Sequence, residues 1–270
     1  MGSLQGKIAV VTGASRGIGK GIAIALGEQG CIVYVTGRTT GDGERTIDTT
    51  AKLVTEAGGD GRAIACDHGD DADIQALFER IGSEVDHIDI LVNNVYKIPS
   101  PPAWGGGFWD HPIQVWDDQV GIGLRAHYVA SWHAASLLFK SDSAAMINIS
   151  SPGGQSYHFS SSYGAGKAGL DRLTADMAIE LEPKNIPAIV IYPGSVATEF
   201  IQDAAKEREM DLSQSQTPLL VGRSVAALLA TDNLMDRSGS IVWVEDVVEE
   251  FDLYDENGSR PTVKYADRAQ

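Results

Sequence analysis

Tyr163 and Lys167 have the spacing that proton transfer by a tyrosine requires. On a helix, residues i and i+4 lie on the same face, so this pair would place an ammonium group beside a phenol. An adjacent cation stabilises the phenolate and lowers the tyrosine pKa from its ordinary value of about 10. Such a tyrosine can act as a general acid or base near neutral pH. The alternative is a half-exposed pair with no chemical role, because this spacing is common by chance.

Ser150 and Ser151 close an apolar run, 145–149, that precedes this segment. A hydroxyl at the end of that run could reach the substrate oxygen that Tyr163 would contact. Either serine fits this role from position alone. The four residues therefore predict a site for acid–base chemistry on an oxygen atom.

A glycine-rich turn, Thr12 to Gly19, stands near the start of the chain. Its spacing is Gly-x-x-x-Gly-x-Gly, and it lies between an apolar β-branched run and a segment with helical periodicity. Glycines let a pyrophosphate approach the backbone, and the helix that follows offers free N–H groups and the positive end of its dipole. The turn therefore predicts dinucleotide binding.

Composition narrows the class of protein. The chain has 270 residues, a formal net charge of −16 and a pI of about 4.6. This charge argues against nucleic acid as a partner, because phosphate backbones are bound by basic surfaces. Cys31 and Cys66 lie in apolar runs and are expected to be buried free thiols. No histidine forms a recognisable metal-ligand spacing, so no metal is expected.

No targeting segment or long apolar stretch is present, which predicts a cytoplasmic protein without stable membrane insertion. Strand-like and helical segments alternate along the whole chain without a linker. We therefore expect an α/β fold: a single Rossmann-type domain, 1–270, with a doubly wound, seven-stranded parallel sheet and helices on both faces. The expected strands are 7–12, 31–36, 62–66, 88–93, 145–150, 187–192 and 240–244. The expected helices are 17–30, 46–57, 73–85, 113–140, 161–182 and 221–230.

Taken together, these motifs resemble the short-chain dehydrogenase/reductase family of the classical type. The matching features are the turn 12–19, Asn93-Asn94, the Ser151, Tyr163 and Lys167 set, and Pro193-Gly194 with Thr198. The resemblance covers about residues 7–244. Val95-Tyr96 after the two asparagines and the segment 255–258 resemble one subgroup of that family.

The resemblance implies a role for each matching residue. Tyr163 is the acid in carbonyl reduction and the base in alcohol oxidation. Lys167 lowers the pKa of Tyr163 and holds the nicotinamide ribose, while Ser151 binds the substrate oxygen. The cofactor supplies the hydride, and the protein supplies orientation and electrostatics. The cofactor-binding residues expected here are Gly13, Ser15, Arg16, Gly17, Ile18, Gly19, Arg38, Asp67, Asn93, Tyr163, Lys167, Pro193, Gly194, Val196 and Thr198.

Two positions depart from the family pattern. Gly123 stands seven residues after Trp116, where relatives have an asparagine that holds a water in the proton relay. With Gly121 it weakens the long helix, so we expect a kink or bulge there, with a water in the space of the missing side chain. Val95-Tyr96 replaces Ala-Gly and puts bulk near the cofactor or the pocket.

Two irregular segments are expected to shape substrate choice. The loop 97–112 carries Trp104, Phe108 and Trp109, and the segment from about 199 to 220 carries Phe200 and further apolar residues. We interpret the second as a mobile lid with an apolar underside. Both favour a small apolar carbonyl or alcohol substrate, although a subunit interface is the alternative. His158 could also face the pocket.

The cofactor is expected to be NADP(H), with NAD(H) as the other possibility. Strand two ends in Gly37 rather than in the acid that binds a ribose 2′-hydroxyl, and Arg38 and Arg16 suit a 2′-phosphate. The resemblance and the helices 113–140 and 161–182 predict a homodimer or homotetramer. The sequence thus predicts an NADP(H)-dependent oxidoreductase. The alternative, motivated by Gly123, is a nicotinamide-binding regulatory or scaffold protein without turnover.

Overall fold

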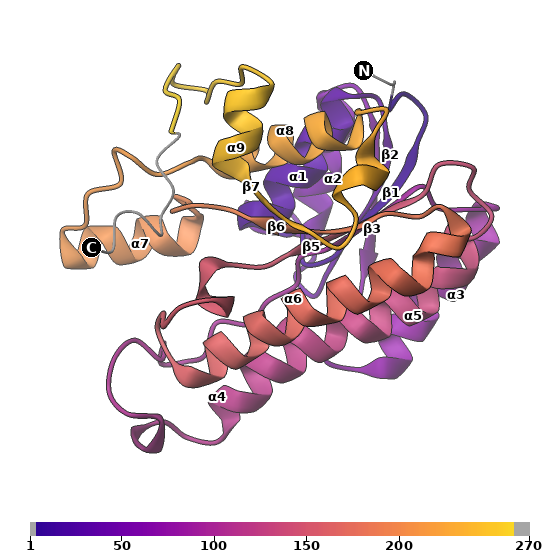
Figure 1. The fold of residues 1–270 in the computed structure, drawn as a ribbon. Coiled ribbons are helices and arrows are strands. Elements are labelled where there is room, and N and C mark those ends of the chain that lie inside the picture. The colour runs from indigo at the N-terminus through magenta and orange to yellow at the C-terminus, as the bar shows by residue number, and fades with distance from the viewer. Residues whose placement is uncertain (1–3, 262–270) are drawn as a thin grey trace.

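One seven-stranded parallel sheet organises the chain (Figure 1). The structure, a computed structural model, describes residues 4–261. The strand order is β3-β2-β1-β4-β5-β6-β7, so the chain reverses its direction of winding between β1 and β4. The strands are β1 (Ile8–Val11), β2 (Ile32–Gly37), β3 (Asp60–Ala65), β4 (Ile90–Asn93), β5 (Ala145–Ile149), β6 (Ala188–Tyr192) and β7 (Ile241–Trp243). The expected fold class is confirmed.

Helices cover both faces of this sheet (Figure 1). The helices are α1 (Gly17–Glu28), α2 (Ile47–Glu56), α3 (Asp71–Glu84), α4 (Gln114–Trp116), α5 (Ala126–Leu138), α6 (Ser161–Leu181), α7 (Glu199–Arg208), α8 (Pro218–Leu229) and α9 (Val244–Glu250). Helices α1, α2, α8 and α9 share one apolar core with the sheet, and α3, α5 and α6 share the other. Within residues 4–261, no helix combines the length and the apolar character that crossing a membrane requires.

Alternate residues of a strand supply the two cores. On β1, Ala9 and Val11 belong to the α1 side and Ile8 and Val10 to the α3 side. Successive side chains of a strand point to opposite faces. Both faces of the inner strands are buried, and this is why their sequence shows continuous apolar runs, whereas the edge strand β3 carries Asp60 and Arg62.

Side-chain caps fix where the site-bearing helices begin. Ser160 Oγ accepts the backbone N–H of Tyr163 at 3.2 Å, which starts α6. Thr198 caps α7 and Thr217 caps α8 in the same way. A cap of this kind stabilises a helix by about 1 kcal/mol. The cap of α6 matters most for function, because that helix carries Tyr163 and Lys167.

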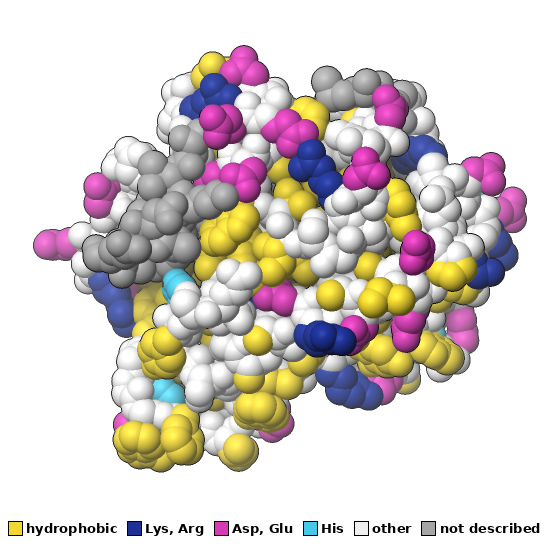
Figure 2. Space-filling model, in the orientation of Figure 1, with side chains coloured by type: hydrophobic (Ala, Val, Ile, Leu, Met, Phe, Trp, Pro, Cys, Tyr) yellow, Lys and Arg dark blue, Asp and Glu magenta, His cyan; other side chains and the backbone are white. Residues whose placement is uncertain are grey.

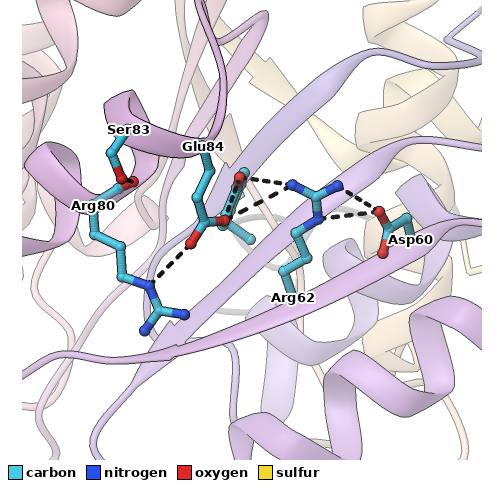
Figure 3. A network of polar contacts seen from close by, with 6 residues as sticks. Asp60, Arg62, Arg80, Ser83 and Glu84 are labelled. Carbon is cyan, nitrogen blue, oxygen red and sulfur yellow. Dashed lines mark hydrogen bonds and ion pairs between the residues drawn. The ribbon is translucent and has the colours of Figure 1, made fainter.

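A polar network ties the edge strand β3 to α3 (Figure 3). Arg62 on β3 donates to Asp60 at 2.8 Å and lies 3.9 Å from Glu84, which also pairs with Arg80. These side chains are partly exposed, so each pair contributes little stability. A charged edge strand also discourages pairing with another chain.

The long helix expected at 113–140 is interrupted. The chain is α-helical over α4, π-helical over Asp117–Arg125 and α-helical again over α5. The π-helical segment contains Gly121 and Gly123, so the expected irregularity at these glycines is confirmed. Glycine lowers the cost of such a segment because it has weak helix propensity and no Cβ.

The expectation for the segment 199–220 was incomplete. It contains a helix, α7, and α8 begins at Pro218, so Leu220 belongs to the buried core. The acidic stretch 245–255 buries Val247 and Val248 together with Glu245 and Asp255. The carboxylate of Asp255 accepts the backbone N–H of Thr217, the cap of α8, at 2.8 Å.

Cys31 and Cys66 are buried free thiols, as predicted. Burial raises the pKa of each to about 12. Both thiols therefore stay protonated at neutral pH and act as small apolar groups in the core.

Candidate active site

A cavity of about 370 Å³ lies at the carboxyl ends of the strands, where the sheet reverses its winding. Ligands bind at this place in open α/β sheets. The expected site residues that line it are Gly13, Ser15, Arg16, Gly17, Ile18, Arg38, Asp67, Ser151, Tyr163, Lys167, Pro193, Gly194, Val196 and Thr198. Gly19, Asn93 and His158 are absent from this lining.

The glycine turn packs tightly against the segment after β4. Gly13 has a φ of +65°, and a Cβ there would lie 2.7 Å from Cα of Val95. A Cβ on Gly19 would lie 2.3 Å from Nδ2 of Asn94. Gly13 thus adopts a left-handed backbone conformation and packs against Val95. Gly19 packs against Asn94 behind the cavity wall.

The structure gives the cavity-lining position to Asn94, where the sequence suggested Asn93. Asn93 is fully buried, and its amide donates to Ser131 at 2.9 Å and to Asn148 at 2.8 Å. It joins β4 to β5 and α5, and its side chain does not reach the cavity, so the expected cofactor contact of this side chain was wrong. Asn94 lines the cavity and donates from Nδ2 to the carbonyls of Thr12 and Gly13 at 2.9 and 3.0 Å. Asn94 therefore braces the glycine turn.

The far end of the cavity carries charged groups. Arg16 and Arg38 both line it, and Arg38 lies 3.7 Å from Asp67 across the ends of β2 and β3. Both partners of this pair are about half exposed, which leaves the guanidinium accessible to a ligand. A bidentate guanidinium is well suited to a phosphate group.

A carboxylate occupies one N–H group of the glycine turn. Glu199, the first residue of α7, accepts the backbone N–H of Gly17 at 2.8 Å. Anionic oxygens are stabilised at helix N-termini by free N–H groups and by the helix dipole. The contact shows that the start of α1 accepts an anionic oxygen in this fold.

The catalytic candidates meet at the other end. Tyr163 and Lys167 project from the first two turns of α6 into the cavity. Lys167 is buried, and its ammonium donates to the carbonyl of Ile149 at 3.0 Å. Burial lowers the pKa of Lys167 to about 8, while Asp171 on the next turn opposes that change. The group is thus a cation that can lose its proton within the physiological range.

Both serines at the end of β5 also line the cavity. Ser151 Oγ accepts the N–H of Gly153 at 3.1 Å, which caps a short 3₁₀ turn. Ser150 is buried and its hydroxyl contacts the carbonyl of Lys167 at 3.4 Å. Of the two, Ser151 is the more exposed to the cavity. A Cβ on Gly153 would lie 2.4 Å from Cε1 of Tyr163, so a glycine is needed where the turn meets the tyrosine.

Sequence reasoning missed the environment of Tyr96. The residue lines the cavity together with Val95, so the extra bulk after Asn94 lies at the site. Its hydroxyl accepts an N–H of Gln119 at 3.0 Å. The Gln119 oxygen accepts the hydroxyl of Ser160, the cap of α6, at 2.9 Å. Gln119 belongs to no sequence motif. The only indication of this arrangement in the sequence was that positions 96 and 123 both depart from the family pattern.

Aromatic side chains form the outer wall of the cavity. The Trp104 ring lies 5.6 Å from that of Phe200 and 6.2 Å from that of Phe159, between centroids. The guanidinium of Arg208, at the end of α7, stands 4.5 Å from the Trp104 centroid. The loop 97–112 and α7 therefore meet over the cavity. Figure 2 shows further apolar side chains gathered at the lower left of the molecule, the side where the chain leads into α4.

Comparison with known proteins identifies the family. The profile described as short chain dehydrogenase matches residues 7–209. The chain belongs to the short-chain dehydrogenase/reductase family. It is an oxidoreductase of CH–OH and carbonyl groups that uses a nicotinamide cofactor. Both the predicted family and the predicted class of enzyme are confirmed.

Individual short-chain dehydrogenases are similar over most of their length. Dehydrogenase/reductase SDR family member 1 of human and of mouse are each 34% identical to this chain over 276 residues, covering 97% of this chain and 87% of each relative. This is the subgroup that Val95-Tyr96 and the segment 255–258 resemble. The structure of the Pseudomonas aeruginosa RhlG/NADP active-site complex superimposes with a TM-score of 0.79 at 29% identity, covering 89% of this chain and 95% of that one.

The residues present fit a nicotinamide dinucleotide. The turn accepts an anionic oxygen at the N–H of Gly17, Gly13 leaves the backbone accessible, and the cavity continues from there to Tyr163 and Lys167. Gly194 packs closely as well, since a Cβ there would lie 2.1 Å from Oε1 of Glu245, whose carboxylate would have to shift. Among residues 4–261, no group of three or more His, Cys, Asp or Glu side chains is arranged to hold a metal ion.

Proposed function

We propose that this enzyme interconverts a carbonyl and an alcohol with NADP(H), using Tyr163 as the general acid and base. The observation that carries the proposal is the convergence of Ser151, Tyr163 and Lys167 in one cavity, with Lys167 buried beneath it. The segment after β5 and the first two turns of α6 bring these three groups together, with Ser151 and Tyr163 placed to contact one substrate oxygen. The bound cofactor supplies or accepts the hydride.

In this proposal each side chain has one task. Tyr163 donates its hydroxyl proton to the carbonyl oxygen during reduction and accepts it back during oxidation. The Ser151 hydroxyl donates a hydrogen bond to the same oxygen and stabilises the negative charge that develops there. The Lys167 ammonium favours the phenolate form of Tyr163 and is placed to hold the nicotinamide ribose. Val196 and Thr198 line the cavity near the nicotinamide end.

The preference for NADP(H) rests on the residues around the adenosine end. No acidic residue follows Gly37 at the end of β2, and Arg38 and Arg16 line the cavity there. Asp67 is the acidic group at this end, and its pairing with Arg38 at 3.7 Å partly neutralises it. Two guanidiniums favour a ribose 2′-phosphate over a 2′-hydroxyl.

The substrate class follows from the aromatic wall. Trp104, Phe159 and Phe200 face the cavity beside Tyr163 and present apolar surface to whatever lies against it. We propose a small apolar carbonyl or alcohol, enclosed by α7 and the loop 97–112, with α7 acting as a lid that must move away to admit it. Exposed apolar side chains on the outer helices, Trp132 on α5 and Ile179 on α6, support assembly into a homodimer or homotetramer.

The test is an NADPH-oxidation screen of the purified protein over ketones, aldehydes and quinones. We expect turnover of an apolar carbonyl by the unaltered protein and at most 1% of it in Tyr163→Phe, because acid–base catalysis contributes about 10²–10⁴-fold. Cofactor binding is measured in parallel by fluorescence. Binding of NADPH without turnover of any carbonyl would favour the alternative, a nicotinamide-binding protein that does not catalyse.

A further inference from the structure

The ring of Tyr96 lies against both Tyr163 and Lys167, the pair proposed to act in proton transfer. The Lys167 ammonium nitrogen is 5.4 Å from the centroid of this ring. The Tyr163 ring meets it edge-on, with centroids 5.9 Å apart and an interplanar angle of 86°. One side chain, from the segment after β4, thus contacts both members of the pair on α6.

The position of this ring depends on Gly123. A Cβ on Gly123 would lie 3.1 Å from Cδ2 and 3.4 Å from Cε2 of Tyr96. The space expected for a water in place of the family asparagine is filled by the Tyr96 ring. A Cβ at position 123 would already press on the ring, and a side chain as long as asparagine would need space that the ring occupies, so the two departures from the family pattern compensate for each other.

The backbone that carries Tyr96 is held from both sides. The N–H of Val95 donates to Thr12 Oγ1 at 3.2 Å, and the Val95 carbonyl is 2.8 Å from Nε2 of His127. Burial lowers the pKa of His127 to about 3, so the imidazole is neutral at neutral pH and its Nε2–H donates to that carbonyl. Tyr96 therefore projects from a fixed peptide into the space that Gly123 leaves.

We infer that Tyr96 is a positioning residue that holds the Lys167 ammonium against its ring face and seats Tyr163 beside it. The inference rests on the proposed function, in which Lys167 and Tyr163 act together. Lys167 is buried, and the face of an aromatic ring stabilises a desolvated cation electrostatically. Charged and titratable groups that face Lys167 from the surrounding elements are Asp171 and Tyr163 on α6, His127 on α5 and Tyr96 itself.

The Tyr96 hydroxyl has a separate task. It accepts from Gln119, whose oxygen in turn accepts from Ser160. Ser160 caps α6 by accepting the N–H of Tyr163. The hydroxyl thus connects the ring to the start of the helix that carries both catalytic candidates, while the ring face alone acts on the ammonium.

The first test measures the charge of Lys167 without any substrate. The ¹³Cε resonance of Lys167, assigned with Lys167→Arg, is titrated by NMR and is expected to change with a midpoint near pH 8. Tyr96→Leu keeps the site apolar but removes the ring, so the midpoint should fall by about one unit, a tenfold change in proton affinity. Tyr96→Phe keeps the ring and should titrate like the unaltered protein.

Two outcomes of this titration would overturn the inference. One is a Tyr96→Leu midpoint equal to that of the unaltered protein in a variant whose thermal unfolding shows an intact fold. The other is an equal shift in Tyr96→Phe, which would assign the effect to the hydroxyl. A protein that turns over no carbonyl would fail the proposed function, yet its Lys167 titration would still decide the role of Tyr96.

The second test is a double-mutant cycle on kcat and KM. Gly123→Asn alone should lower kcat by about tenfold or more, because its side chain displaces the ring, and Tyr96→Gly alone should do the same. In the double variant Tyr96→Gly/Gly123→Asn the clash is absent, so the loss should be smaller than the product of the single losses. Losses that multiply, or single losses seen in KM alone, would contradict a positioning role.

Discussion

The two ends of the cavity are built by different parts of the chain. At the phosphate end, one contiguous turn, Gly13 to Gly19, supplies backbone groups at the start of α1. At the reaction end, side chains come from the segment after β4, from the π-helical segment, from β5 and from α6. The first end is mainly backbone held in a local conformation, with Arg16 and Arg38 beside it, whereas the second end is built from packed side chains of several segments.

This difference predicts what an amino-acid substitution does at each end of the cavity. Backbone N–H groups cannot be removed by most substitutions, so the phosphate end depends on glycines that let the backbone approach. The reaction end depends on individual side chains that contact one another: Ser160 donates to Gln119, Gln119 donates to Tyr96, and the Tyr96 ring, in the space that Gly123 leaves, faces Lys167. Substitutions should therefore affect catalysis at one end and cofactor affinity at the other.

The largest effect is expected for Tyr163→Phe. Loss of the acid–base hydroxyl should lower kcat by about 10²–10⁴-fold. The dissociation constant for NADPH should change only a few-fold, because the phosphate end is untouched. Steady-state kinetics and fluorescence titration check both expectations, with Tyr254→Phe, an exposed tyrosine, as the control. Near-normal turnover would remove Tyr163 from the mechanism.

The reaction end should also make the fold sensitive to acid. His127 has a folded-state pKa of about 3, against an ordinary value of 6.5, because it is buried. The unfolded chain therefore binds a proton that the folded chain excludes. This contribution to stability is complete above pH 6.5 and is lost progressively as the pH falls toward 3.

At pH 4.5 the loss from His127 should amount to about 2–3 kcal/mol relative to pH 7, at 1.36 kcal/mol per unit. Urea unfolding of the unaltered protein and of His127→Gln at both pH values measures it. The variant should lose less stability on acidification. An equal loss in both proteins would show that His127 does not contribute.

At the phosphate end, Arg38→Ala should weaken NADPH binding about 10–100-fold. A charge-assisted hydrogen bond contributes about 1.5–3 kcal/mol, and each 1.4 kcal/mol is a factor of ten. NADH affinity should change little, since it has no 2′-phosphate. Arg172→Ala, which removes an exposed arginine paired with Asp176, is the matched control. Equal weakening of both cofactors would refute recognition of the 2′-phosphate.

The smallest effect is expected for Glu199→Gln. The carboxylate now accepts the N–H of Gly17 and places a negative charge beside the cofactor phosphates. Its removal should raise affinity for NADPH a few-fold without changing kcat for the chemical step. Glu207→Gln, on the exposed side of the same helix, should have no effect. Weaker binding in Glu199→Gln would mean that the carboxylate stabilises the cofactor-bound form instead.

The sequence alone was sufficient for the features that depend on local patterns. Apolar β-branched runs marked the strands, since a parallel sheet buries both faces of each strand. The glycine spacing marked the turn, and the four-residue spacing placed Tyr163 and Lys167 on one face of α6. The irregular helix at Gly121 and Gly123 was also predictable, because glycine has weak helix propensity. Each of these inferences needs only neighbours along the chain.

The tertiary structure decided what depends on partners far apart in the chain. It placed Asn93 in the core and Asn94 at the turn, a difference of one residue that follows from the alternation of a strand. It also placed the Tyr96 ring against Gly123, with Lys167 at its face, although these residues lie on three separate segments. Tyr96 and Gly123 looked like two separate departures in the sequence, because the space that one residue leaves and another fills exists only after the segments have packed.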